Sequence, residues 1–383
     1  MESRAWTNAS RRTVGIDMIP LFKVITETET CLKNIEQVLK SGYIGEGDWV
    51  EKFENALAKE WDTQKRVLTV NSCTSALELA MHMCGVKDKY VITTPQTCTA
   101  TNTAIVSRGG KILWADVDQF TGNISPLSVA NLVHAYGKEN IAAVVCVDWG
   151  GSAVNYDDLR ICANGIPIIE DAAHSYLTRY KGEHISNTGG DYVCFSFQAI
   201  KHLTTVDGGA LIVPEGQEKR AELLRWYGLD RKSSASFRCA QTVTEAGFKF
   251  HMNNVAAAIG LANMDTAFRS VVKSNMNAIR YSDMIKTGKG VIYTPIYDPE
   301  GSYWLYTILV KERDKFIAYM KENGVDTSPV HARNDKHPCF PPRDPNNKGI
   351  DYFSAHNVSI PCGSWLTRED FDKIVDLVNA WNP

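Results

Sequence analysis

Residues 195–210 read FSFQAIKHLTTVDGGA. An apolar strand leads into a single lysine, Lys201, and polar residues and the pair Gly208-Gly209 follow it. A lysine at a rigid strand end, partly desolvated and with flexible backbone beside it, is suited to nucleophilic chemistry on a bound cofactor. Because lysines followed by two glycines are common, this stretch needs support from other parts of the chain.

Support comes from residues 166–174, IPIIEDAAH, in which Asp171 follows an apolar strand. A carboxylate in that place is desolvated and needs a cation. The protonated ring nitrogen of pyridoxal phosphate is such a cation, and Lys201 would be the Schiff-base lysine for the same cofactor. The alternative for a lone aspartate after a strand is a helix N-cap.

A third segment, residues 71–77, reads NSCTSAL and joins an expected strand to an expected helix. The backbone N–H groups at a helix start point toward an anion, and the helix dipole favours a negative charge there. The turn is therefore a candidate phosphate site. The alternative is ordinary helix capping by Ser72 or Thr74.

Together and in this order, the three segments resemble the DegT/DnrJ/EryC1/StrS family of sugar aminotransferases. The resemblance runs from IPLF at residues 19–22 to Ile360-Pro361. It implies the aspartate aminotransferase fold (fold type I) with pyridoxal 5'-phosphate as cofactor. The implied reaction moves an amino group from L-glutamate to a nucleotide-linked keto-deoxysugar, with a 4-keto sugar favoured, for amino-sugar and polysaccharide biosynthesis.

The resemblance also implies roles for single residues. Lys201 would be the catalytic residue, Asp171 would bind the ring nitrogen, and His174 would lie close to the ring. The cofactor phosphate would be bound by Cys73, Thr74, Ser75 and Ser196. A histidine packed on the sheet and a strand serine bonded to its neighbours are the alternatives for His174 and Ser196.

Two positions depart from the family pattern. Cys98, in PQTCTAT at residues 95–101, stands where the family often has an aromatic residue that stacks on the cofactor ring. Lys249, in GFKFHM, stands where the family has an asparagine that reaches the phosphate from the partner subunit. Lys249 could replace it as a point charge, which predicts a homodimer with shared active sites.

Two further segments are candidates for substrate binding. Gly45 and Gly47 lie in GYIGEG at residues 42–47, which resembles the family's loop at the mouth of the site. His331 aligns with a family histidine near the sugar, and Arg333 is suited to a diphosphate or carboxylate. A helix-terminating turn and a solvated polar loop are the alternatives. No metal site is expected, because the spacing of His331, His337 and Cys339 fits no common zinc pattern.

Two rival functions share this fold. In the deoxysugar dehydratase branch the catalytic lysine is replaced by histidine, whereas here Lys201 keeps the position and His202 follows it. A non-catalytic regulatory or binding protein is the other rival. The presence of Lys201, Asp171 and Ser196 argues against it.

The amino-acid composition limits the kinds of protein that this chain can be. The 383 residues are 44% hydrophobic, enough for a large and a small domain, and the net charge of −3 provides no basic surface for nucleic acid. Ten cysteines without a CxxC pair predict reduced thiols and a cytoplasmic location. The longest clearly apolar strand, residues 141–147, is too short to cross a membrane.

The expected architecture is α/β. Near-continuous apolar strands are expected at residues 66–70, 90–93, 112–116, 141–148, 166–170, 192–197 and 210–213. Such strands separated by helices predict a mostly parallel sheet with helices on both faces, whose ligands gather at the carboxyl ends of the strands. We expect a disordered extension over residues 1–17, an N-terminal arm and large cofactor-binding domain over 18–265, and a small C-terminal α+β domain over 266–383.

Overall fold

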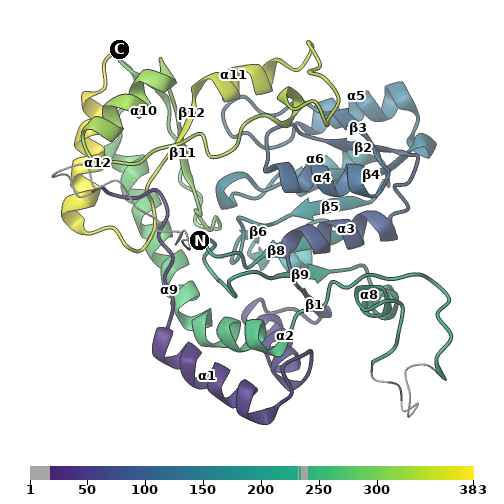
Figure 1. Ribbon diagram of the computed structural model, residues 1–383. Helices are drawn as coiled ribbons and strands as arrows, with labels where there is room; N and C mark the ends of the chain where they lie inside the picture. The colour runs from purple at the N-terminus through teal and green to yellow at the C-terminus, as the bar shows by residue number, and fades with distance from the viewer. Residues whose placement is uncertain (1–17, 232, 234–239) are drawn as a thin grey trace, which may run out of the picture.

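A computed structural model describes residues 18–231, 233 and 240–383. The extension predicted for residues 1–17 lies outside the described residues. The centre of the molecule is a seven-stranded sheet in the order β1-β9-β8-β5-β4-β2-β3 (Figure 1). In that order, the strands span Val67–Val70, Gly209–Ile212, Tyr192–Ser196, Ile168–Asp171, Ile141–Val147, Tyr90–Thr93 and Lys111–Trp114.

The sheet is mostly parallel, as the apolar strands predict. The pairs β8·β5, β5·β4, β4·β2 and β2·β3 are parallel, whereas β9 runs antiparallel to both of its neighbours. All seven residues of β4 are buried, which explains why this strand carries no polar residue.

Helices cover both faces of this sheet. One face packs on α2 (Asp48–Glu60), α5 (Pro126–Tyr136), α6 (Tyr156–Ala163) and part of α9 (Asn254–Met284). The other face packs on α3 (Cys73–Met83), α4 (Thr99–Ser107) and α8 (Glu218–Arg225). The α/β fold with a covered, mostly parallel sheet is therefore confirmed.

A second, three-stranded sheet forms the C-terminal part. It has the order β10-β11-β12, with strands at Val291–Tyr293, Tyr306–Val310 and Asn357–Ile360, all antiparallel. It lies beside α10 (Arg313–Glu322), α11 (Lys348–His356) and α12 (Arg368–Ala380). The helix α9 runs from α1 (Thr28–Ser41) and α2 toward this sheet in Figure 1. The expected boundary at residues 265 and 266 falls inside α9, so the domain division stays a prediction.

The remaining elements are short. They include the hairpin β6 (Arg179–Tyr180) and β7 (Glu183–His184) and the helix α7 (Ile185–Thr188). Within the described residues, no helix has the length and apolar character needed to cross a bilayer.

Candidate active site

A cavity of about 740 Å³ opens at the carboxyl ends of the central strands. The chain reaches it from the end of β1, the end of β5 and the turn after β8, as expected for ligand sites of parallel sheets. Most of the residues singled out in the sequence line it. They are Cys73, Thr74, Cys98, Asp171, His174, Ser196, Lys201 and His331.

Lys201 lies in the turn that follows β8, where its backbone N–H donates to the carbonyl of Gln198 at 2.9 Å. Its Nζ lies 3.5 Å from the centroid of the Trp304 ring. Burial lowers the pKa of Lys201 to about 8, although Asp171 and two cysteines nearby oppose the shift. The amine can therefore gain or lose a proton close to neutral pH.

Asp171 is the last residue of β5 and is 4% exposed. Its Oδ2 accepts a hydrogen bond from Thr101 Oγ1 at 2.6 Å, and its Oδ1 accepts from the backbone N–H of Ala173 at 3.1 Å. Burial raises the pKa of Asp171, and these two donors partly offset the effect. Within the described chain Asp171 forms no ion pair, although the nearby Lys201 favours its ionised form, so the carboxylate could pair with a cation that enters the cavity.

The turn between β1 and α3 presents backbone donors. Ser72 caps α3, since its Oγ accepts from the N–H of Ser75 at 3.1 Å. The capping alternative is therefore realised, yet it leaves the N–H groups of Cys73 and Thr74 without an acceptor among the described residues. A Cβ on Gly209 would lie 2.7 Å from the Cys73 nitrogen, so only glycine lets β9 pack this closely on the turn.

Ser75 and Ser196 differ in whether their hydroxyl groups can donate a hydrogen bond to a phosphate in the cavity. The Ser75 hydroxyl donates to Asn71 Oδ1 at 2.6 Å, and Ser75 does not line the cavity. The Ser196 hydroxyl accepts from the N–H of Gln198 at 3.4 Å, which leaves its own proton to donate. A phosphate at this turn would therefore meet Cys73, Thr74 and Ser196, while the side chain of Ser75 serves the turn itself.

The stacked rings of Trp304 and His174 lie beside Lys201. The His174 ring stacks on Trp304 with centroids 4.1 Å apart and lies 5.8 Å from the His331 ring. His174 Nδ1 accepts from the N–H of Gly150 at 3.2 Å, and burial lowers the pKa of His174 well below its usual value. The neutral ring therefore carries its proton on Nε2. Sequence reasoning missed Trp304, although it stands in the aromatic run Tyr303-Trp304 before a strand.

Besides Ser75, four residues singled out in the sequence do not line this cavity. Gly45 accepts from the N–H of Asn254, Gly47 precedes α2, and Lys249 Nζ lies 4.7 Å from the Trp226 ring. Arg333 is 6% exposed. Its guanidinium binds Asp335 and, at 2.6 Å, Asp351. These contacts favour a structural role for Arg333, and the predicted roles of Gly45, Gly47 and Lys249 stay predictions.

The mostly parallel sheet, the desolvated lysine and the buried carboxylate at one sheet edge define a fold-type-I enzyme of the pyridoxal-phosphate-dependent class. The model of the DegT/DnrJ/EryC1/StrS aminotransferase family matches residues 25–379. The chain belongs to this family, and it is an aminotransferase.

Relatives and solved structures agree with this assignment. A Campylobacter jejuni protein named UDP-4-amino-4,6-dideoxy-N-acetyl-beta-L-altrosamine transaminase is 34% identical over 358 residues, which cover 90% of this chain and 92% of the relative. The Bacillus subtilis spore coat polysaccharide biosynthesis protein SpsC is 30% identical over 374 residues, covering 91% and 93%. The crystal structure of AtS13 from Actinomadura melliaura is 35% identical with a TM-score of 0.89, covering 96% of this chain and all of that chain.

Proposed function

We propose that the protein transfers an amino group from L-glutamate to the keto group of a nucleotide-linked deoxysugar, with a 4-keto sugar favoured. The observation that carries this proposal is the position of the Lys201 amine in one cavity with the buried carboxylate of Asp171, which forms no ion pair in the described chain. The name of the Campylobacter relative places an amino group at C4 of a UDP-linked sugar, which supports the 4-keto form. The names of the same relatives support a role in amino-sugar or polysaccharide synthesis. A cytoplasmic location stays a prediction.

The residues of the cavity fit pyridoxal phosphate. The N–H groups of Cys73 and Thr74 and the hydroxyl of Ser196 would hold the phosphate, and Asp171 would hold the ring nitrogen. When bound, the cofactor supplies an electron sink for the carbon that gains or loses a proton. A cavity of about 740 Å³ is large enough for a cofactor and part of a second ligand.

Lys201 would move that proton. A general base or acid acts best when its pKa lies near the working pH, and burial places the pKa of Lys201 at about 8. The protein therefore has an amine that could accept a proton from the α-carbon of the amino donor and deliver it to a carbon of the cofactor. A histidine would replace this amine in the dehydratase branch, so Lys201 favours amino transfer over that rival.

The reaction can be tested in two halves. Cofactor-loaded protein mixed with L-glutamate should release 2-oxoglutarate in a single turnover and lose its visible absorbance band. Keto sugars linked to UDP or dTDP are then added one at a time, and the acceptor is the sugar that restores the band. Mass spectrometry of the sugar decides the class: an amino sugar supports the proposal, whereas loss of a neighbouring hydroxyl without amination contradicts it.

A homodimer with shared sites is part of the proposal, and Lys249 provides the test. Lys249→Ala should weaken pyridoxal phosphate binding about 10- to 100-fold, because one charge-assisted bond to the phosphate contributes about 1.5–3 kcal/mol. Equilibrium titration of the visible band measures this. Lys111→Ala is the control, since Lys111 also lies near an aromatic ring but on β3, at the opposite edge of the sheet from β1.

Subunit mixing separates action across the dimer from action within one chain. Inactive Lys201→Ala chains are mixed with defective Lys249→Ala chains under conditions of proven exchange. A hybrid dimer has one site with both lysines, so part of the activity should return. Activity that stays at the sum of the two parents places Lys249 in its own chain's site or away from the phosphate.

A further inference from the structure

Trp304 contacts three other segments of the chain, which carry Phe22, His174 and Ile200. It precedes β11, and its Nε1–H donates to the carbonyl of Ile200 at 2.9 Å, directly before Lys201. The centroid of its ring is 3.5 Å from Lys201 Nζ. One side chain thus contacts both the backbone that places the lysine and the amine at its end.

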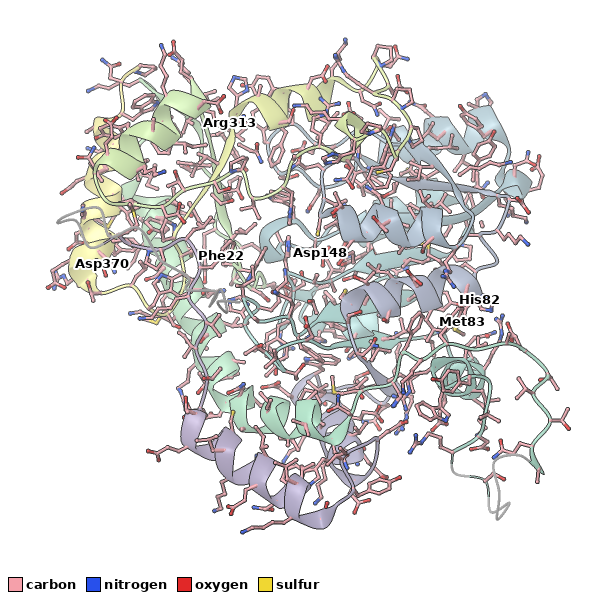
Figure 2. All side chains as sticks on the ribbon, viewed as in Figure 1. Phe22, His82, Met83, Asp148, Arg313 and Asp370 are labelled. Atoms are coloured by element: carbon pink, nitrogen blue, oxygen red, sulfur yellow. The ribbon has the colours of Figure 1, made fainter. Side chains whose placement is uncertain are left out.

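The Trp304 ring is itself fixed on several sides. It stacks on His174 with centroids 4.1 Å apart and on Phe22 with centroids 4.9 Å apart, and it is 8% exposed. Phe22 belongs to the segment before α1 and lies near the centre of the molecule in Figure 2. A ring packed in this way has little rotational freedom, so it can serve as a rigid support.

The backbone around Trp304 is also held. Ser302 N–H donates to the carbonyl of Gly151 at 2.9 Å, and Leu305 N–H donates to the carbonyl of Gly150 at 3.2 Å. Tyr303 adopts a left-handed conformation with φ of 49°, which a non-glycine residue keeps only when its surroundings enforce it. The position of the indole is therefore set by the segment at the end of β4.

Lys201 has no other strong partner. Among the described residues its amine makes no ion pair and no side-chain hydrogen bond. Asp171 also favours the charged form, but the face of Trp304 is the group that the amine directly contacts. A carboxylate partner would hold the ammonium more strongly, and Asp171 would be the candidate. An ion pair between Lys201 and Asp171 would occupy the carboxylate that the protonated ring nitrogen of the cofactor needs as its partner.

We infer that Trp304 is a positioning residue for Lys201: its indole face holds the amine whenever this is not joined to the cofactor, and its Nε1–H fixes the turn that carries the lysine. The inference rests on the proposed function, because it assumes that Lys201 detaches and then moves protons. An aromatic face keeps the amine near the reacting carbon and leaves Asp171 without an ion pair, so that its carboxylate can bind the cofactor ring nitrogen.

The test measures the lysine directly in the full chain stripped of cofactor. Competitive acetylation across a pH series, followed by peptide mass spectrometry, gives the pH at which half of Lys201 is unprotonated. This midpoint should be about 8 in the unmodified protein. Tetrafluorotryptophan introduced at position 304 alone weakens the attraction of the ring for a cation while changing its shape little. The midpoint should then fall by about 0.5–1 pH unit.

Trp149 provides the matched control. Its buried ring contacts His174 and His331 as well, but it does not contact Lys201. Tetrafluorotryptophan at position 149 should therefore leave the midpoint unchanged. An unchanged midpoint after fluorination at 304, or an equal shift after fluorination at 149, overturns the inference. The other titratable groups near Lys201 are present in both proteins, and they are Asp171, Cys73, Cys98, His174, His202 and His331.

Two further measurements separate a failure of the Trp304 inference from a folding defect and from a failure of the proposed function. If the fluorinated indole disturbs the fold, Trp304→Phe and pentafluorophenylalanine at the same position make the same comparison on a smaller ring, again with a lower midpoint expected for the fluorinated form. Borohydride fixation of cofactor-loaded protein shows separately which lysine binds the cofactor. A label on another peptide defeats the proposed function, whereas a label on Lys201 with no shift in the midpoint defeats only the role of Trp304.

Discussion

Lys201→Ala protein should transfer amino groups about 10⁴-fold more slowly than the unaltered enzyme, or not at all. The substitution removes both the nucleophile that joins the cofactor and the acid–base group that moves the proton, and the acid–base function alone contributes about 10²- to 10⁴-fold. The purified variant should also lack the visible absorbance band that depends on a covalent link to the lysine.

Single-turnover release of 2-oxoglutarate measures the rate, and borohydride fixation followed by peptide mapping locates the link. Lys23→Ala is the matched control, because Lys23 is an exposed lysine that lines a small cavity beside Lys201. It should keep the band and most of the activity. Normal turnover by Lys201→Ala, or a label on a different lysine, would remove the central residue of the proposal.

The sheet and its site edge were predictable because both depend on local patterns. Runs such as residues 141–147 are apolar without interruption, which is typical of a strand buried on both faces, and β4 is buried throughout. Asp171 stands at the end of a mostly apolar run, and Lys201 lies in the turn after another. Parallel strands end at the same edge, so both residues were expected at that edge, and the adjacency of β5 and β8 then brings them together.

Contacts between distant segments were not predictable in this way. Thr101 and Trp304 contact Asp171 and Lys201 across 70 and 103 positions of the chain, and no periodicity encodes those pairs. The contact of Arg333 with Asp335, in contrast, joins residues close together in the sequence. Asp335 stands two positions away and offered a local partner for the guanidinium, so the sequence already contained the signal for a structural ion pair.

Asp171→Asn should reduce the rate of each half-reaction about 10²- to 10⁴-fold while the protein stays folded. A buried charge pair that loses one member costs about 3–5 kcal/mol, and here the lost member is the carboxylate that would keep the ring nitrogen protonated. The amide also fits the site poorly. Thr101 and the N–H of Ala173 both donate to the two oxygens, and an asparagine can present an acceptor to only one of them.

Thr101→Val tests the same carboxylate in a milder way. Thr101 stabilises the ionised form of Asp171, so its removal should raise the pKa of Asp171 above the already raised value. The carboxyl group would then become protonated at a higher pH as the solution is acidified, and the acid limb of the rate profile should move to higher pH. Rates near pH 8 should change little. An acid limb that stays in place, together with an active Asp171→Asn enzyme, would show that this carboxylate does not hold the cofactor ring, because both changes act on its negative charge.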